Sequence, residues 1–135
     1  AHMGGIYYQQ DNYPEALKNY FAALKIAEEQ RDKIGIANCY SNSGVVYKKQ
    51  GNYSEAMKNY FDALKLYEEM GYKQGLASVY NNIGLIYKNQ GNYAEALKNY
   101  LISLKIAKEI TIDEKTKDYQ WHASFKEKLG LDFSK

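Results

Sequence analysis

The sequence has few residues that interrupt helices or cross-link chains. It holds one proline and one cysteine among 135 residues, and no apolar run of the roughly 20 residues that a membrane-spanning helix needs. Cys39 therefore has no partner for an internal disulfide, and it is expected to be a small buried residue in a cytoplasmic protein. Residues 1–3, Ala-His-Met, are typical of a tag remnant and are excluded from the fold.

The sequence also lacks a dominant charge. It carries 18 basic and 16 acidic residues, and the two signs alternate along the chain. Such a balance gives no strong field to attract nucleic acid or an anionic membrane, so neither is expected as a partner. The 15 tyrosines recur at fixed spacing, which favours core positions over base stacking.

Catalytic groups are scarce as well. His122 is the one histidine outside residues 1–3, no cluster has metal-ligand spacing, and no glycine-rich phosphate loop is present. His122 follows Trp121, which favours a packing role over acid or base chemistry. The sequence therefore predicts no enzyme, no cofactor and no metal site.

The sequence does contain one segment that is repeated three times. Tyr13, Tyr53 and Tyr93 begin "YPEALKNYFAALKIAEE", "YSEAMKNYFDALKLYEE" and "YAEALKNYLISLKIAKE", and they are 40 residues apart. Periodicity of this length is typical of a solenoid of stacked supersecondary units.

Each repeat is predicted to hold two helices. In the middle copy, apolar and small residues at spacings of three and four predict a helix from about residue 35 to residue 50, ended by Gly51. The second helix begins at once, because Asn52 and Glu55 are expected to form a capping box in which each side chain bonds the other's backbone amide. The same pair recurs as Asn12/Glu15 and Asn92/Glu95.

The apolar face of the second helix is wider than one neighbouring helix can cover. Each repeat must therefore bury the faces of the next one, which explains the repetition. Gly44 and Gly84 are expected where two helices approach too closely for a side chain. The apolar face of the middle copy consists of Ala56, Met57, Tyr60, Phe61, Ala63, Leu64 and Tyr67.

Small and aromatic residues at these spacings resemble the signature of the tetratricopeptide repeat. Its usual unit has about 34 residues, and the longer period here is similar to the repeats of kinesin light chains, spindle-orientation adaptors, quorum-peptide receptors and bacterial signalling proteins. The matching residues are Tyr40, Gly44, Tyr47, Ala56, Tyr60 and Ala63, then Tyr80, Gly84, Tyr87, Ala96, Tyr100 and Ser103, with a partial set at Gly4, Tyr7, Ala16, Tyr20 and Ala23.

The resemblance implies an all-α fold, a right-handed α-solenoid of stacked antiparallel helix pairs. Repeat 1 is expected over residues 4–34 with its first helix truncated, repeat 2 over 35–74 and repeat 3 over 75–112. A C-terminal capping helix over 113–130 is expected to begin with a capping box of Thr111 and Glu114, and a tail follows over 131–135. Trp121, Phe125 and Leu129 give that helix a stripe that can cover the last repeat.

The resemblance also implies a concave groove, lined by the first helices, that holds a peptide or a partner's helix. Asn42 and Asn82 are poor helix formers placed in mid-helix, and a carboxamide both donates and accepts hydrogen bonds, as gripping a peptide backbone requires. The alternative is that both asparagines bond a neighbouring helix or face water. The expected groove residues are Asn38, Ser41, Asn42, Val45, Lys48, Lys49, Ser78, Asn81, Asn82, Leu85, Lys88 and Asn89.

A known device of the family, a basic clamp for a terminal carboxylate, is not expected here. Its positions hold Ser41, Val45, Asn82, Asp118 and His122, and only Asn82 matches. Lys48 and Lys88 either favour an acidic ligand or complement the helix dipole, and we favour the dipole. Two rows of lysines on the second helices are interpreted as a solvated face paired with nearby glutamates: Lys18, Lys58 and Lys98, and Lys25, Lys65 and Lys105.

Together these features predict a noncatalytic protein interaction module, part of a larger signalling or scaffold protein, whose groove binds a peptide or a partner protein. The alternative is a self-assembly element. The truncated first helix would leave one flank of the first repeat open, and such flanks favour end-to-end stacking or exchange between copies.

Overall fold

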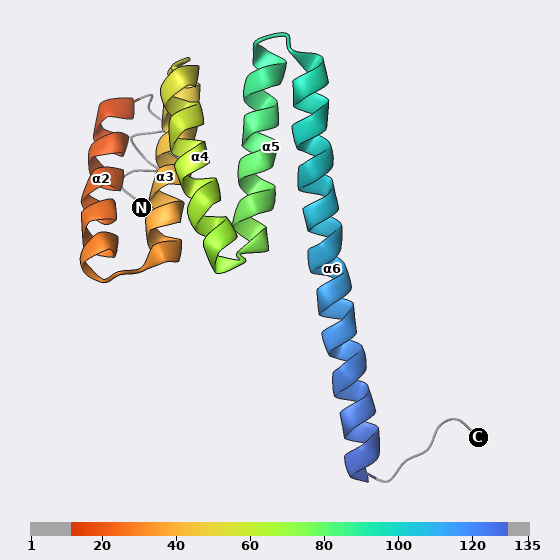
Figure 1. The fold of residues 1–135 in the computed structure, drawn as a ribbon. Coiled ribbons are helices and arrows are strands. Elements are labelled where there is room, and N and C mark those ends of the chain that lie inside the picture. The colour runs from red at the N-terminus through yellow and green to blue at the C-terminus, as the bar shows by residue number, and fades with distance from the viewer. Residues whose placement is uncertain (1–11, 130–135) are drawn as a thin grey trace.

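The computed structural model describes the backbone of residues 12–129 and the side chains of residues 12–115. This part of the chain holds five α-helices and no strand, so the predicted all-α fold is confirmed (Figure 1). Consecutive helices lie side by side and alternate in direction. The truncated helix expected over residues 4–10 lies outside the described residues. The helices are α2 (Tyr13–Glu29), α3 (Lys33–Lys49), α4 (Tyr53–Met70), α5 (Lys73–Asn89) and α6 (Tyr93–Leu129).

The predicted capping boxes are half right. In all three second helices the asparagine accepts a hydrogen bond from the glutamate amide, as in the 3.3 Å bond from Glu55 N to Asn52 Oδ1. The reciprocal bond is wrong at Asn52, because its own amide donates to Tyr47 O at 2.9 Å and thereby closes the end of α3. Asn92 does the same with Tyr87 O. The N-cap amide therefore bonds the last turn of the preceding helix and is not available to the glutamate side chain.

Residues in the left-handed backbone conformation follow the ends of α2, α3, α4 and α5. Gly51, Gly71 and Gly91 have φ values of 76°, 62° and 80°, which cost glycine nothing because it lacks a Cβ. Arg31 occupies the place of Gly71 one repeat earlier and has a φ of 55°. An arginine in that conformation is strained, so this turn carries a cost that the later turns avoid.

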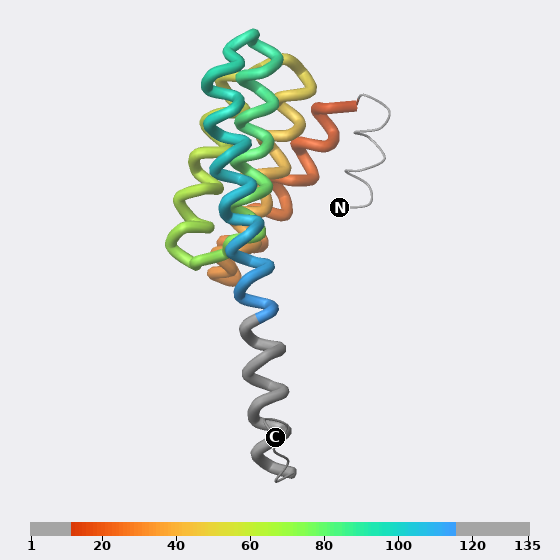
Figure 2. The backbone as a smooth tube through the Cα atoms, turned by 90° about the vertical axis from the view of Figure 1, so that its right-hand side faces the viewer, coloured from red at the N-terminus to blue at the C-terminus, as the bar shows by residue number. Residues whose placement is uncertain are grey.

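The core lies between successive helix pairs. α3 packs along α4 and α5 along α6, while the contacts of α2 with α3 and of α4 with α5 join the pairs. Figure 2 looks onto α6, with the other helices stacked behind it. The largest fully buried side chains come from three different helices: Val46 of α3, Tyr60 of α4, and Val79, Ile83 and Ile86 of α5.

Two glycines let first and second helices approach closely, as predicted. A Cβ at Gly44 would lie 2.6 Å from Cε1 of Tyr60, and a Cβ at Gly84 would lie 2.6 Å from Cε1 of Tyr100. Each tyrosine ring therefore occupies the space that a side chain would need, and the pairs lock α3 to α4 and α5 to α6.

The expectation of a separate capping helix is wrong. α6 runs unbroken from Tyr93 to Leu129, so no helix starts at Asp113. Thr111 stands where Gly71 ends α4, and its hydroxyl donates to Ala107 O at 3.2 Å, a bond within the helix rather than a cap. Without a glycine at this place the helix has no inexpensive way to turn. The covering role expected of Trp121, Phe125 and Leu129 concerns side chains outside the described residues.

Candidate functional site

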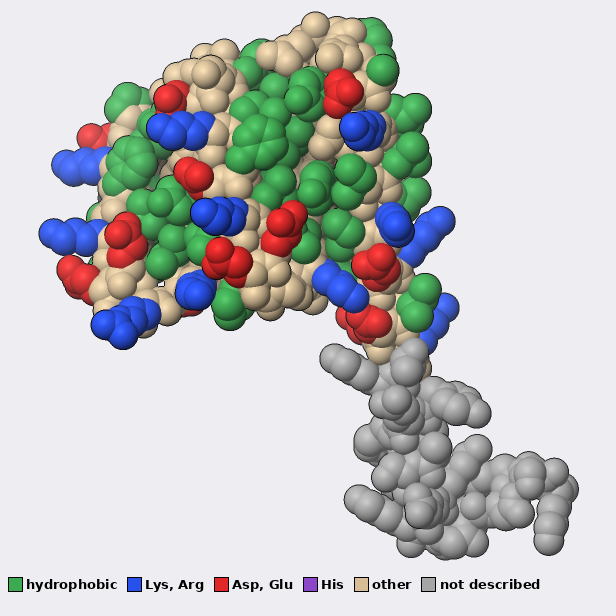
Figure 3. Space-filling model, in the orientation of Figure 1, with side chains coloured by type: hydrophobic (Ala, Val, Ile, Leu, Met, Phe, Trp, Pro, Cys, Tyr) green, Lys and Arg blue, Asp and Glu red, His purple; other side chains and the backbone are tan. Residues whose placement is uncertain are grey.

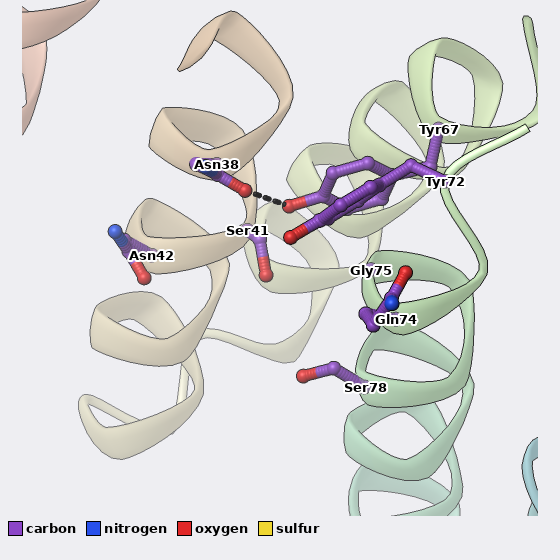
Figure 4. Close-up of a pocket in the computed structure, with 8 residues that line it drawn as sticks. All are labelled: Asn38, Ser41, Asn42, Tyr67, Tyr72, Gln74, Gly75 and Ser78. Atoms are coloured by element: carbon purple, nitrogen blue, oxygen red, sulfur yellow. Dashed lines mark hydrogen bonds between the residues drawn. The ribbon is translucent and has the colours of Figure 1, made fainter. Parts of the chain in front are cut away.

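The first helices of neighbouring repeats, α3 and α5, contact one another and form the walls of a hollow of about 310 Å³. Figure 4 shows its lining side chains on α3, the end of α4 and the start of α5, with the Asn42 amide turned away from the two tyrosines. We call this hollow the groove pocket. Its residues are Asn38, Ser41, Asn42, Tyr67, Tyr72, Gln74, Gly75 and Ser78.

Two tyrosines form one wall of the groove pocket. The rings of Tyr67 and Tyr72 lie 5.5 Å apart between centroids, and Tyr67 Oη donates a 2.5 Å hydrogen bond to Asn38 Oδ1. Burial, with Tyr72 adding to it, raises the pKa of Tyr67 to about 12, so the hydroxyl remains a neutral donor at physiological pH. Gly75 makes this wall possible, because a Cβ there would lie 2.6 Å from the Tyr67 ring.

Four of the expected groove residues meet in this pocket: Asn38, Ser41, Asn42 and Ser78. Asn38, Asn42 and Ser78 are exposed, and Ser41 is partly buried. No hydrogen bond joins the Asn42 carboxamide to another described residue. Its donor and acceptor groups therefore remain available to a ligand.

Lys48 and Asn82 are brought together across the same groove. Lys48 Nζ donates to Asn82 Oδ1 at 2.9 Å, and Asn82 Nδ2 donates to Ser78 O at 3.1 Å. The alternative reading of a mid-helix asparagine that bonds a neighbouring helix therefore applies to Asn82 in the free chain. Burial lowers the pKa of Lys48 below its usual range, because a partly buried ammonium loses solvation that one neutral amide does not replace.

The remaining expected residues lie outside the groove pocket. Val45 packs against the core, and Leu85 is partly buried. The other four are exposed: Lys49, Asn81, Lys88 and Asn89.

Four further residues line the pocket without having been expected there: Tyr67, Tyr72, Gln74 and Gly75. The predicted core position of Tyr67 is confirmed, since it is 3% exposed, but its hydroxyl end also reaches the pocket. A signal was present, since Tyr67 departs from the alanines at the same repeat position, Ala27 and Ala107.

The pocket offers hydrogen bonds without charge. Every polar group that lines it is an amide or a hydroxyl, so it suits peptide backbone or uncharged polar side chains. Within residues 12–115 no group of three or more histidine, cysteine, aspartate or glutamate side chains is placed to hold a metal ion. No helix in the described part of the chain is long and apolar enough to cross a membrane.

Several solved structures share the fold. The TPR domain of Arabidopsis FLU superposes with a TM-score of 0.71 at 19% identity, covering 80% of this chain and 91% of that domain. BtubC from P. vanneervenii gives 0.68 at 24% identity, covering 79% and 44%, and apo RapI gives 0.68 at 26% identity, covering 97% and 45%. The chain thus spans less than half the length of BtubC or RapI. A search of curated proteins gives no match.

The sequence itself matches two models of the tetratricopeptide repeat. One covers residues 1–69, more than half of the chain, and the other covers residues 77–109. Within the described residues, both matches lie on the paired helices of Figure 1. Such repeats form a protein interaction module. The chain belongs to the tetratricopeptide repeat family.

Proposed function

We propose that the groove between α3 and α5 binds an extended segment of a partner protein, and that the chain is a noncatalytic interaction module of a larger signalling or scaffold protein. The observation that carries this proposal is the groove pocket. Its side chains come from two successive repeats and present hydrogen-bonding groups to solvent, with Asn42 exposed and unbonded within the described residues. Exposed polar groups held on rigid helices can bind a ligand without the cost of ordering loops.

The chemistry of the pocket supports binding rather than catalysis. Amides and hydroxyls line it, with no carboxylate, imidazole or thiol to act as general base or nucleophile. Cys39 is buried, and burial raises the pKa of its thiol, with Asp32 adding to the effect. A thiol in that state is a poor nucleophile.

A selection from a displayed library of random 12-residue peptides on the immobilised 135-residue chain tests the proposal. The tightest peptide is then measured by fluorescence anisotropy against the double variant Asn42→Ala, Ser78→Ala. We expect a loss of about 1 to 3 kcal/mol in binding free energy with the melting temperature unchanged. Asn89→Ala, exposed and outside the pocket, is the control and should bind like the parent. Equal binding by the double variant would place the ligand elsewhere.

Self-association is a second candidate, because one face of α6 has the composition of an interface between repeats. Leu64 of α4 is 6% exposed beneath α5, whereas its equivalent Leu104 is 51% exposed. The same contrast separates half-buried Tyr53 from Tyr93, which is 69% exposed. Figure 3 shows hydrophobic side chains along the edge of α6 that faces away from α5. We call this surface the open flank: Tyr93, Leu97, Leu104 and Ala107.

Sedimentation velocity over a range of concentrations tests this candidate. If copies associate through the open flank, Leu104→Glu should give monomers at concentrations where the parent chain forms dimers or larger species. Phe61→Glu is a matched control, since Phe61 is 53% exposed but lies on α4. A parent chain that stays monomeric at every concentration would exclude self-association.

A further inference from the structure

The charges of the chain are unequally shared between its first and second helices. α3 and α5 together carry five lysines and no acidic residue, whereas α4 alone carries four acidic residues. One of the five, Lys73, is paired with Asp113 of α6 at 2.8 Å. The helices that line the groove therefore carry positive charge that their own residues do not neutralise.

Lys48 differs from the other lysines of these helices. It is partly buried at the groove, and the bond it makes to another described residue is the one to the neutral amide of Asn82. An ammonium group has three donors, so two remain beside the Asn82 bond. A cation that has lost part of its hydration gains more from a carboxylate than an exposed one does, because the local dielectric constant is lower.

The position of this ammonium relative to the groove pocket follows from the helix geometry. Nζ of Lys48 is held at Asn82, four residues after Ser78 of the pocket, which is about 6 Å along α5. An extended peptide advances about 3.3 Å per residue, so two residues span that distance. A peptide lying along α5 would place one side chain in the uncharged pocket and the side chain two positions away beside Lys48.

We propose that the partner segment carries a bipartite motif: an uncharged polar side chain that enters the groove pocket, and an aspartate or glutamate two residues away that binds Lys48. This inference rests on the proposed function of the groove. It also assigns Lys48 a role in recognition, which the helix dipole interpretation does not. Lys88 is the same residue one repeat later, but it is exposed and makes no such bond, so it serves as a matched control.

The peptides selected on the parent chain provide the first test. We expect them to be enriched in aspartate or glutamate two positions from asparagine, glutamine, serine or threonine. The tightest peptide and its Glu→Gln or Asp→Asn form are then measured against the parent chain, Lys48→Met and Lys88→Met. Each of the peptide change and Lys48→Met should weaken binding about tenfold, as for one charge-assisted hydrogen bond.

Combining the two changes should cause little further loss, since they remove the same contact. Lys88→Met should weaken binding less than twofold. Enriched peptides without an acidic residue at that spacing, or equal losses for the two lysine variants, would overturn the inference and leave the proposed function standing. A selection that enriches no peptide would overturn both.

Discussion

Gly44 and Gly84 provide a matched pair of substitutions that tests the packing of the repeats. Each glycine lies in the interior of a first helix, and each faces the tyrosine of its own second helix with the same 2.6 Å limit on a new Cβ. The rings differ in freedom, because Tyr60 is 0% exposed while Tyr100 is partly exposed. Alanine would therefore make the same close contact with a tyrosine ring at both sites, but the Tyr100 ring has more room to move away than the Tyr60 ring.

The expected magnitudes follow from two opposing effects. Alanine is favoured over glycine in a helix interior by about 1 kcal/mol, and this gain is shared by both sites. At Gly44 the new methyl would be about 0.8 Å too close to a ring with no open side, and overpacking of this kind costs about 1 to 3 kcal/mol. We expect Gly44→Ala to lower the free energy of unfolding by about 1 kcal/mol.

At Gly84 the partly exposed Tyr100 can rotate towards solvent, so the gain in helix propensity should offset most of the cost. Gly84→Ala should lie within about 0.5 kcal/mol of the parent. Its other near neighbour, the backbone oxygen of Ala96 at 3.2 Å, is closer than most Cβ contacts, so that oxygen must also shift by a few tenths of an ångström.

Denaturant unfolding followed by helical circular dichroism measures both variants. A double-mutant cycle with Tyr60→Leu then separates the steric cost from other effects, since the smaller side chain gives the methyl room and Gly44→Ala should become neutral or stabilising in that background. Equal losses at the two glycines, or a loss at Gly44 that persists in the Tyr60→Leu background, would refute the reasoning.

Three further outcomes are expected. Arg31→Gly should raise the free energy of unfolding by about 0.5 to 1 kcal/mol, because it relieves the positive φ, and thermal unfolding measures the gain. Between pH 10 and pH 12 the tyrosines of the unfolded chain lose their protons, whereas buried Tyr67 keeps its own. The free energy of unfolding therefore falls as pH rises through this range. The fall should be smaller in Tyr67→Phe, when unfolding of the variant and the parent is measured at both ends of the range. Lys48→Met should keep or raise the melting temperature, because it removes a desolvated charge, although it weakens ligand binding. A clear loss of stability would instead show that Lys48 is a structural residue.

The sequence predicted those parts of the fold that depend on residues within a single repeat. Helix starts at Asn52 and helix ends at Gly51 depend on a few neighbouring residues, and the 40-residue period shows which residues recur together. The close approach at Gly44 was also predictable, because a glycine in mid-helix has few other uses. What the period could not show is the tertiary competition for a donor, as when Asn52 gives its amide to Tyr47 O rather than to Glu55.

The candidate site was predicted only in part for a related reason. Repeat spacing places Asn42 and Ser78 on the first helices, but the groove pocket is completed by Tyr67 and Tyr72, which depart from the repeat. Residues that recur describe the shared framework, and those that differ between copies shape a surface that exists once. The link between Lys48 and Asn82 is likewise a contact between unlike positions of two repeats.

One repeat position controls whether the second helix of a repeat ends. The same repeat position holds Arg31, Gly71 and Thr111 in the three copies. It lies just beyond the end of α2 and of α4, but inside α6. Glycine turns freely, arginine turns under strain with a φ of 55°, and threonine remains helical with its hydroxyl on Ala107 O. A β-branched residue bears the steric cost of the left-handed conformation and has limited rotamer freedom, so continuing the helix is the lower-energy course. The helix therefore passes the place where another repeat would begin, and the open flank of α6 stays uncovered by any described part of the chain because a continuous helix cannot fold back upon itself.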